Sequence, residues 1–244
     1  MDAHFPPRLG KTTMLETPNS ILELDIYENP ARTVLRGVLI LHPWAKLGGS
    51  MEDPTVITQF RAAIESGLFS HVCRYNMRGA GASKTKWTKN IWDPDIQDML
   101  LVAQHLLQLP NGPKELVVIG YSYGACVAAN LMEHMPEVVA YVAIGFPLGG
   151  MANLALRSRD HWQHLADTPV PKLVVQGTRD KFAPMTTIRD YAQQYHDMQP
   201  APGPLDLEIV DGADHFFDGI WDMVAEKVLA WVQKQLDAQQ VAGA

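Results

Sequence analysis

The sequence is poor in cysteine and in charged residues, and it contains no long hydrophobic run. Only 19% of its 244 residues are charged and the formal net charge is −7, which argues against a disordered chain, a coiled coil and a nucleic-acid-binding protein. The longest nearly apolar stretch, residues 138–146, is about half of the roughly 18 residues that a membrane-spanning helix needs. These shortages leave a globular protein whose 47% of hydrophobic residues can fill a large core.

The cysteines and the first residues bear on the compartment. Cys73 and Cys126 lie in apolar surroundings without C-x-x-C spacing, a pattern typical of buried thiols in a reducing compartment rather than of disulfides. The chain begins MDAHFPPRLGK, with an early acid and a Pro-Pro pair in place of the apolar core of a signal peptide. We therefore expect a cytoplasmic protein that is not exported.

Short hydrophobic runs alternate with segments of helical periodicity. We expect helices at residues 54–66, 95–109, 123–135, 184–197 and 220–239. We expect strands at residues 21–27, 36–41, 71–75, 116–119, 139–144, 172–176 and 205–210. Several of these runs are apolar throughout, which indicates strands that helices cover on both faces of the sheet. The alternation predicts a doubly wound α/β fold with a mostly parallel sheet.

Two departures from strict alternation are expected. The first two predicted strands are joined by Asn29-Pro30 and a short polar stretch, without a helix, so we expect an N-terminal antiparallel hairpin. Residues 147–171 are too many for an ordinary loop and too few for a second domain, and they predict a short cap-like insertion with one or two helices. Residues 1–244 are expected to form a single domain.

The strongest motif is Gly120-Tyr121-Ser122-Tyr123-Gly124, placed directly between a predicted strand and a predicted helix. A nucleophile on such a sharp turn has strained backbone angles, and the two glycines are needed because a Cβ would clash with neighbouring segments. Serine is a weak nucleophile by itself. The motif therefore predicts a histidine base and an acid that orients it, in the chain order Ser, Asp or Glu, His.

Both partners have candidates at the carboxyl edge of the sheet, where open α/β sheets build their sites. Asp180 follows the sixth predicted strand, and His215 follows the seventh. Asp211 and Asp214 are alternatives to Asp180, although Asp214 adjoins His215 and is poorly directed to hold its ring. The predicted catalytic set is Ser122, Asp180 and His215.

Acyl transfer also needs donors for the oxyanion. One is the backbone N–H of Tyr123, directly after the serine. The loop after the strand at residues 36–41 should supply the second: Pro43 has no N–H, so Trp44 is preferred and Ala45 is the alternative. His42, at the end of that strand, suits a hydrogen-bonded organiser of the loop better than a catalytic base.

These residues resemble the α/β-hydrolase superfamily, and the resemblance covers nearly the whole chain. The nucleophile elbow, His-Pro in the place of the family's His-Gly, the R-G-x-G-x-S of residues 78–83, the G-x-x-D ending at Asp180 and the D-H ending at His215 fall in family order. Residues 75–81 are similar to the loop of a small subgroup with little or no lid. The resemblance implies a hydrolase fold and not a substrate, since this fold hosts esterases, thioesterases, peptidases, dehalogenases and non-catalytic proteins.

Weaker features concern the substrate. The candidates for an apolar pocket flank predicted strand ends and are Ala45, Phe146, Met151, Phe182 and Phe216. Residues 78–89 carry four cations and no acid. This basic segment either attracts an anionic substrate or is an ordinary solvated loop.

We predict a serine hydrolase that cleaves a small carboxylic ester or thioester through an acyl-enzyme, with neither a metal nor an organic cofactor. A peptidase or aminopeptidase on the same triad is one alternative, and it needs an acidic anchor for the substrate amine, for which Asp160 and Asp167 are candidates. A non-catalytic scaffold that binds a ligand or a partner is the other. An insertion of about 25 residues cannot form a lid that shelters a long lipid, so small or exposed acyl groups are favoured.

Overall fold

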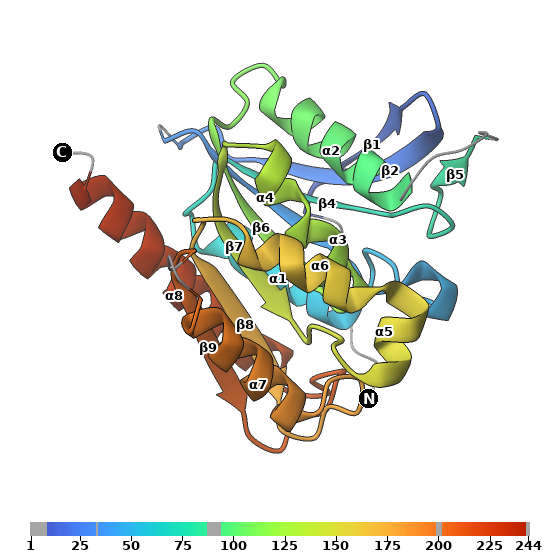
Figure 1. Ribbon diagram of the computed structural model, residues 1–244. Helices are drawn as coiled ribbons and strands as arrows, with labels where there is room; N and C mark the ends of the chain where they lie inside the picture. The colour runs from blue at the N-terminus through green and yellow to red at the C-terminus, as the bar shows by residue number, and fades with distance from the viewer. Residues whose placement is uncertain (1–8, 33, 87–93, 199–201, 243–244) are drawn as a thin grey trace.

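The computed structural model describes residues 9–32, 34–86, 94–198 and 202–242. One twisted sheet runs through this part of the chain in the order β1-β2-β4-β3-β6-β7-β8-β9, and β5 pairs with β2 outside this path (Figure 1). The strands are β1 (Lys11–Glu16), β2 (Ser20–Glu28), β3 (Arg36–Leu41), β4 (His71–Tyr75), β5 (Lys84–Thr85), β6 (Glu115–Tyr121), β7 (Val138–Ile144), β8 (Lys172–Gly177) and β9 (Leu205–Val210).

The pairing confirms the predicted mostly parallel sheet. From β4 through β3, β6, β7 and β8 to β9, every neighbouring pair is parallel, while β1, β4 and β5 all pair antiparallel with β2. Consequently the carboxyl ends of β3, β6, β8 and β9 lie on the same edge of the sheet.

The N-terminal hairpin is present, but the prediction of its strands was wrong. The hairpin consists of β1 and β2, and β4 lies between β2 and β3. The edge strand β1 is largely exposed, and its sequence, KTTMLE, has no continuous apolar run. Hydrophobic periodicity therefore does not reveal this strand. When β1 is not recognised, β3 is the nearest strand along the chain with which β2 can be predicted to pair.

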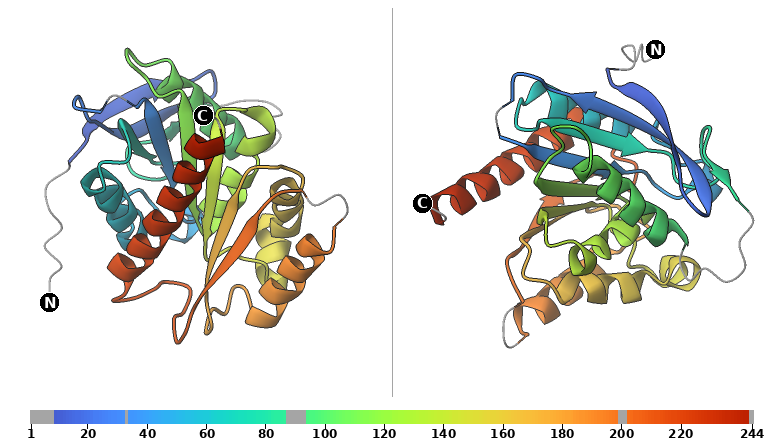
Figure 2. Two further views of the ribbon diagram at one scale, coloured as in Figure 1. Left: turned by 90° about the vertical axis from the view of Figure 1, so that its left-hand side faces the viewer. Right: turned by 90° about the horizontal axis from the view of Figure 1, so that it is seen from above.

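Helices cover both faces of the sheet, as predicted (Figure 2). On one face, α1 (Pro54–Glu65) and α8 (Trp221–Ala242) pack over a core that includes Val56, Phe60, Val224 and Val228. A second core lies on the opposite face. The helices that enclose it are α2 (Pro94–Leu107), α3 (Tyr123–Ala129), α4 (Leu131–His134), α6 (Ser158–Ala166) and α7 (Met185–His196).

The helix predicted at residues 123–135 is divided in two at Asn130. Its side-chain amide donates to the carbonyl oxygens of Cys126 and Val127, at 2.9 and 3.2 Å, and so satisfies the end of α3. The insertion between β7 and β8 contains two helices, α5 (Gly150–Leu156) and α6, which are joined at Arg157 in the left-handed conformation (φ 52°). None of the described helices is long and apolar enough to cross a membrane.

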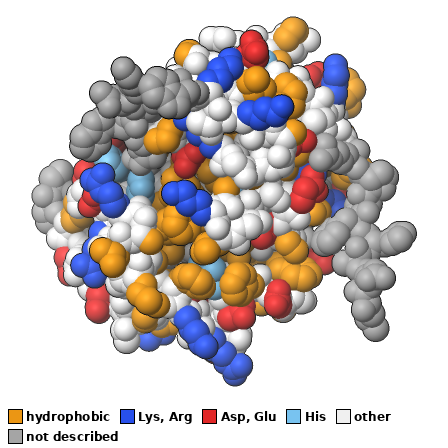
Figure 3. All heavy atoms as spheres, turned by 90° about the vertical axis from the view of Figure 1, so that its right-hand side faces the viewer, with side chains coloured by type: hydrophobic (Ala, Val, Ile, Leu, Met, Phe, Trp, Pro, Cys, Tyr) orange, Lys and Arg blue, Asp and Glu red, His pale blue; other side chains and the backbone are white. Residues whose placement is uncertain are grey.

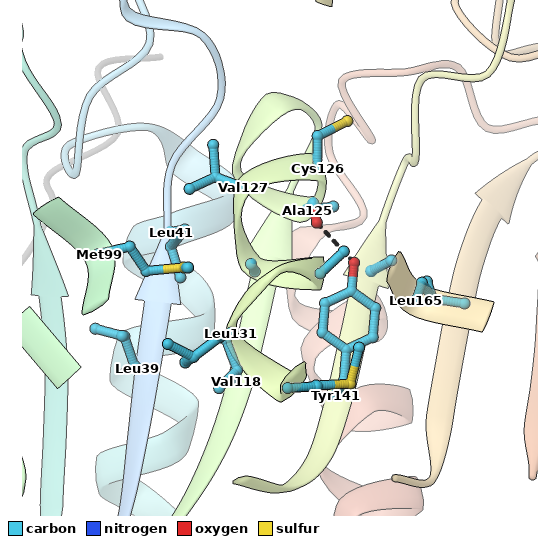
Figure 4. Packing of buried hydrophobic residues seen from close by; sticks show 14 of the residues in the cluster. Leu39, Leu41, Met99, Val118, Ala125, Cys126, Val127, Leu131, Tyr141 and Leu165 are labelled. Carbon is cyan, nitrogen blue, oxygen red and sulfur yellow. Dashed lines mark hydrogen bonds between the residues drawn. The ribbon is translucent and has the colours of Figure 1, made fainter. Parts of the chain in front are cut away.

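The short helix α3 is fixed by the core beneath it. The Tyr141 hydroxyl donates to the carbonyl oxygen of Ala125 at 2.7 Å, and Leu41, Val118 and Cys126 belong to the same buried cluster (Figure 4). Cys73 and Cys126 are buried free thiols, as the sequence predicted, and burial raises the pKa of Cys73. Because α3 is held by β7 from below, the turn that precedes it has little freedom to move.

Candidate active site

Ser122 lies on a strained turn between β6 and α3. Its φ is 54° and its ψ is −119°, a combination that non-glycine residues rarely adopt. A Cβ on Gly120 would lie 2.4 Å from the Cα of Ala125, and one on Gly124 would lie 2.6 Å from the carbonyl oxygen of His42. The two glycines of the motif are therefore required by close backbone approach on both sides of the serine.

Ser122, His215 and Asp180 form a continuous chain of hydrogen bonds. Nε2 of His215 lies 2.8 Å from Oγ of Ser122, and Nδ1 lies 2.7 Å from Oδ2 of Asp180. All three side chains are buried. Because a carboxylate only accepts, Nδ1 carries a proton, and the neutral ring then presents an acceptor, Nε2, to the serine hydroxyl.

The carboxylate of Asp180 is held by several donors. Its Oδ1 accepts from the backbone N–H groups of Phe182 and Ala183, at 2.7 and 3.2 Å, and its Oδ2 accepts from the Gln176 amide at 2.6 Å. The two alternative acids are engaged elsewhere, since Asp211 accepts from Thr178 and Asp214 accepts from the N–H of Phe216. Asp180 is thus the acid that the fold brings to His215.

The segment that carries His215 is held at both its backbone and its ring. The Tyr121 hydroxyl donates to the His215 carbonyl oxygen at 3.0 Å, and the Phe182 ring lies 4.4 Å from the imidazole, centroid to centroid. A Cβ at Gly145 (φ 59°) would lie 3.3 Å from the imidazole ring. Little space remains in which the imidazole could turn away from Ser122.

The two predicted oxyanion donors lie beside Ser122 on different segments. Tyr123 is the first residue of α3, where a backbone N–H has no acceptor within the helix. Trp44 precedes the short 3₁₀ helix η1 (Ala45–Leu47), lines the same pocket as Ser122, and has its ring 6.2 Å from that of Tyr123. This placement leaves Trp44 a better candidate than Ala45, which faces a neighbouring cavity.

His42 is wholly buried beneath this loop. Its Nε2 accepts from the Met77 N–H at 2.8 Å, so the neutral ring donates from Nδ1 to the Pro43 carbonyl oxygen, 2.5 Å away. Burial lowers the pKa of His42 to about 4, against the opposing effect of the bond to Pro43. These contacts are those of a residue that organises the loop before Trp44.

A cavity of about 190 Å³ opens over Ser122 and His215. Phe182 and Phe216 of the predicted pocket residues line it, whereas Met151 lines an adjoining apolar groove of about 430 Å³ and Ala45 a cavity of about 580 Å³. Phe146 was wrongly assigned to the pocket: it is wholly buried and packs edge-on against Trp162, 5.3 Å away. A strand end that enters the core cannot be distinguished from one that enters a pocket by hydrophobicity alone.

The three cavities meet at Trp44, which lines all of them. Several large hydrophobic side chains that line them are exposed to solvent, namely Leu47, Met151, Phe182 and Phe216. Figure 3 shows the side of the molecule on which α5 lies, and hydrophobic side chains gather over the lower half of this face. The entrance to the site is open and largely apolar, with the small insertion at its rim.

The described part of the basic segment serves the framework rather than the pocket of Ser122. Arg78 forms a two-pronged ion pair with the buried carboxylate of Asp98, at 2.5 and 2.9 Å, and Lys86 donates to the carbonyl oxygen of Thr17. Lys84 is exposed on β5, and Lys89 lies outside the described residues. Arg78 does reach the wall of the 580 Å³ cavity.

Two residues of the site were not anticipated. Gln176, near the end of β8, falls within a predicted strand, and its contact with Asp180 depends on a turn that no sequence pattern specifies. Asp53 lines the Ser122 pocket and also caps α1, with its carboxylate accepting from the N–H of Thr55. The Asp-Pro pair predicts the start of a helix, but it does not indicate that Asp53 also lines a pocket.

A doubly wound sheet with a serine on a strained strand-to-helix turn, hydrogen-bonded to a histidine and an aspartate from later strand ends, defines the class of α/β hydrolases. A family model described as an alpha/beta hydrolase domain matches residues 48–231, more than half of the chain. The chain therefore belongs to the alpha/beta hydrolase family.

Known proteins similar to this chain include one curated sequence and several solved structures. The uncharacterised protein RP471 of Rickettsia prowazekii is 26% identical over 179 residues, covering 73% of this chain and 71% of its own length. An alpha-beta serine hydrolase homologue from Coxiella burnetii superimposes with a TM-score of 0.74 at 22% identity, over 90% of this chain and 96% of that one. XC6422 from Xanthomonas campestris, described as a serine hydrolase without lid, gives 0.72 at 21% identity, over 94% and 96%. At these identities the structural likeness concerns the fold.

Proposed function

We propose that the chain is a serine hydrolase that cleaves small carboxylic esters or thioesters through an acyl-enzyme. The observation that carries this proposal is the unbroken chain from Ser122 Oγ through the His215 ring to Asp180, at 2.8 and 2.7 Å. The distances are those at which a base can take the proton of the hydroxyl, and the serine occupies a strained, glycine-flanked turn. A non-catalytic scaffold has no need for either feature.

In the proposed reaction, Nε2 of His215 removes the proton of Ser122 as the serine oxygen attacks the substrate carbonyl. The backbone N–H groups of Tyr123 and Trp44 stabilise the negative oxygen of the tetrahedral intermediate. Asp180 stabilises the imidazolium, which then protonates the leaving alcohol or thiol. A water molecule, activated by the same His215, hydrolyses the acyl-enzyme and restores the serine.

Covalent labelling tests this proposal most directly. A fluorophosphonate probe should label the protein at Ser122, and 4-nitrophenyl acetate should be hydrolysed at a rate far above that of buffer. Ser122→Ala removes the nucleophile and leaves the turn's glycines in place, so it should abolish both labelling and hydrolysis. Absence of labelling in the folded protein, or full esterase activity in Ser122→Ala, would contradict the mechanism and favour a binding scaffold.

The peptidase alternative loses the anchors that the sequence suggested for it. Asp160 pairs with Arg157 on the exposed insertion, and Asp167 accepts from Gln163 one turn away. Neither is among the residues that line the Ser122 pocket. Parallel assays of an ester and of the anilide of the same acid separate the two activities, and the proposal expects turnover of the ester.

A further inference from the structure

The pocket over Ser122 combines a carboxylate with several aromatic side chains. Its walls include Asp53 and four aromatic residues, and no lysine or arginine is among the described residues that line it. The aromatic residues are Trp44, Tyr121, Phe182 and Phe216. With His215 neutral, Asp53 carries the only formal charge among the described residues of this wall. The ammonium of Lys46, which lines the neighbouring cavity, lies over the Trp44 ring at 5.5 Å from its centroid, so Phe182 and Phe216 are the ring faces left for a ligand.

Asp53 lies close to the reacting groups and is partly removed from water. It is half-buried, and burial raises its pKa although the N–H groups of Thr55 and Val56 act in the opposite direction. Asp53 and His215 line the same pocket, and a positive charge on His215 would also lower the pKa of Asp53. The proposed mechanism gives this carboxylate no task.

The chemistry of such a pocket favours one kind of group. Alkylammonium ions are attracted to the faces of aromatic rings and to a carboxylate, and the attraction is strongest where water is excluded. An anionic substrate group would instead be repelled by Asp53. A cation would also offset the unfavourable effect of Asp53 on the oxyanion that develops beside Ser122.

Resting on the proposed serine hydrolase activity, we propose that this pocket binds an alkylammonium group of the substrate, so that the enzyme prefers esters or thioesters with a positively charged nitrogen near the scissile carbonyl. The remainder of the substrate has space in the adjoining apolar groove, which shares Trp44, Leu47 and Phe182 with the pocket. Asp53 is then a specificity-determining residue as well as a helix cap.

The test compares charged substrates with uncharged isosteres. One pair is the thioacetate of thiocholine and that of 3,3-dimethylbutanethiol, which places the charge in the leaving group. The other pair, 4-nitrophenyl 4-(trimethylammonio)butanoate and 4-nitrophenyl 5,5-dimethylhexanoate, places it in the acyl group. For each pair, kcat/KM of the charged substrate is divided by kcat/KM of the uncharged one, in the wild type and in Asp53→Asn. Comparing this ratio between the two proteins cancels the intrinsic reactivity of the esters.

We expect the ratio to fall about ten-fold in Asp53→Asn for at least one pair, because the variant loses the charge. Asparagine caps helices as well as aspartate, so the variant should fold with an unchanged Tm; Asp53→Ser, which also retains a cap, is measured beside it. Glu52→Gln is the matched control: it removes a neighbouring negative charge that does not line the pocket and should keep the wild-type ratio. Equal ratios in the wild type and both Asp53 variants would overturn the inference.

Failure of the proposed function is distinguishable from failure of this inference. If the probe labels Ser122 and uncharged esters are hydrolysed but the ratio does not change, only the inference is wrong. If the folded protein is neither labelled nor active, the hydrolase proposal is wrong, and titration calorimetry with tetramethylammonium chloride still measures recognition of the cation. At least five-fold weaker binding to Asp53→Asn than to the wild type would support the recognition, and equal binding would overturn it.

Discussion

Gln176 donates to the same oxygen of Asp180 that accepts from His215. The two bonds to Oδ2 measure 2.6 and 2.7 Å, while Oδ1 is occupied by the backbone of Phe182 and Ala183. The direction in which Asp180 presents Oδ2 to the imidazole therefore depends on a side chain four residues earlier, on the strand that precedes Asp180. The other side-chain atom of this amide, Gln176 Oε1, is buried without a hydrogen-bond partner among the described residues.

Gln176→Met should lower kcat/KM by about ten-fold, since a hydrogen bond to a charged group contributes about 1.5 kcal/mol. The Tm should stay close to that of the wild type, because the substitution also removes the unpartnered Oε1. Steady-state kinetics on 4-nitrophenyl acetate and a thermal melt measure the two effects. A lowered Tm together with wild-type kcat/KM would mean that Gln176 supports the strand and does not position Asp180.

Asp180→Asn should cost about 10⁴-fold in kcat, because an asparagine amide facing Nδ1 favours the wrong tautomer of His215. The proton would then sit on Nε2, which faces the Ser122 hydroxyl. Nε2 could then no longer accept the hydroxyl proton, as the mechanism requires. Burst kinetics with 4-nitrophenyl acetate should show that acylation becomes slow. Asp214→Asn is the control, since Asp214 bonds to the N–H of Phe216, and it should retain wild-type kinetics.

The parallel part of the fold was predictable because β3, β4, β6, β7 and β8 are buried along nearly their whole length and because most of these strands alternate with segments of helical period. β1 was not, since its alternating exposure and polar residues give no such signal. The break at Asn130 was missed for a different reason. It depends on a side-chain bond back to the carbonyls of α3, and helical periodicity continues across it.

The positions of Ser122, Asp180 and His215 could be predicted because each follows a parallel strand, and topology alone then brings them to one edge. Gln176 and Asp53 could not be assigned to the site. Their own segments explain them fully, one as a strand residue and the other as a helix cap. No sequence pattern shows that Gln176 meets Asp180 or that the start of α1 borders the pocket of Ser122. Phe146 shows the opposite error, since a strand-end aromatic turned into the core.

His42 predicts a pH dependence of stability. The folded pKa of about 4 lies below the ordinary value of 6.5, so the unfolded chain binds more protons between these values and stability falls as the pH decreases through this window. Between pH 7 and pH 5 this group alone should cost about 2 kcal/mol of unfolding free energy. Urea denaturation of the wild type and His42→Gln at both pH values isolates the effect, because all other groups titrate in both proteins. Equal losses in the two proteins would show that His42 does not supply this dependence.

The close approach at the elbow predicts the effect of a single methyl group. In Gly124→Ala the new Cβ would lie 2.6 Å from the carbonyl oxygens of Leu41 and His42, so α3 must move away from the end of β3. That movement separates Ser122 from the loop that carries Trp44, and the expected cost is about 1–3 kcal/mol of stability with a large loss of kcat. Gly150→Ala, where a Cβ meets no atom within 4 Å, should change neither. Wild-type turnover in Gly124→Ala would mean that the oxyanion donors tolerate this displacement.

The apolar groove at the entrance predicts how activity varies with acyl length. Met151 lines the groove and is 86% exposed, whereas Leu154, on the same helix and 87% exposed, is not among the residues that line it. Each methylene group that enters such a groove gains up to about 0.8 kcal/mol, so kcat/KM for 4-nitrophenyl esters should rise from acetate to hexanoate.

Met151→Asp should reduce the hexanoate-to-acetate ratio of kcat/KM by about ten-fold, because a carboxylate in the wall opposes burial of the chain. Leu154→Asp adds the same charge to the same helix outside the groove and should keep the ratio. If the two variants behaved alike, the acyl chain would not lie against α5, and the groove would have to receive another part of the substrate.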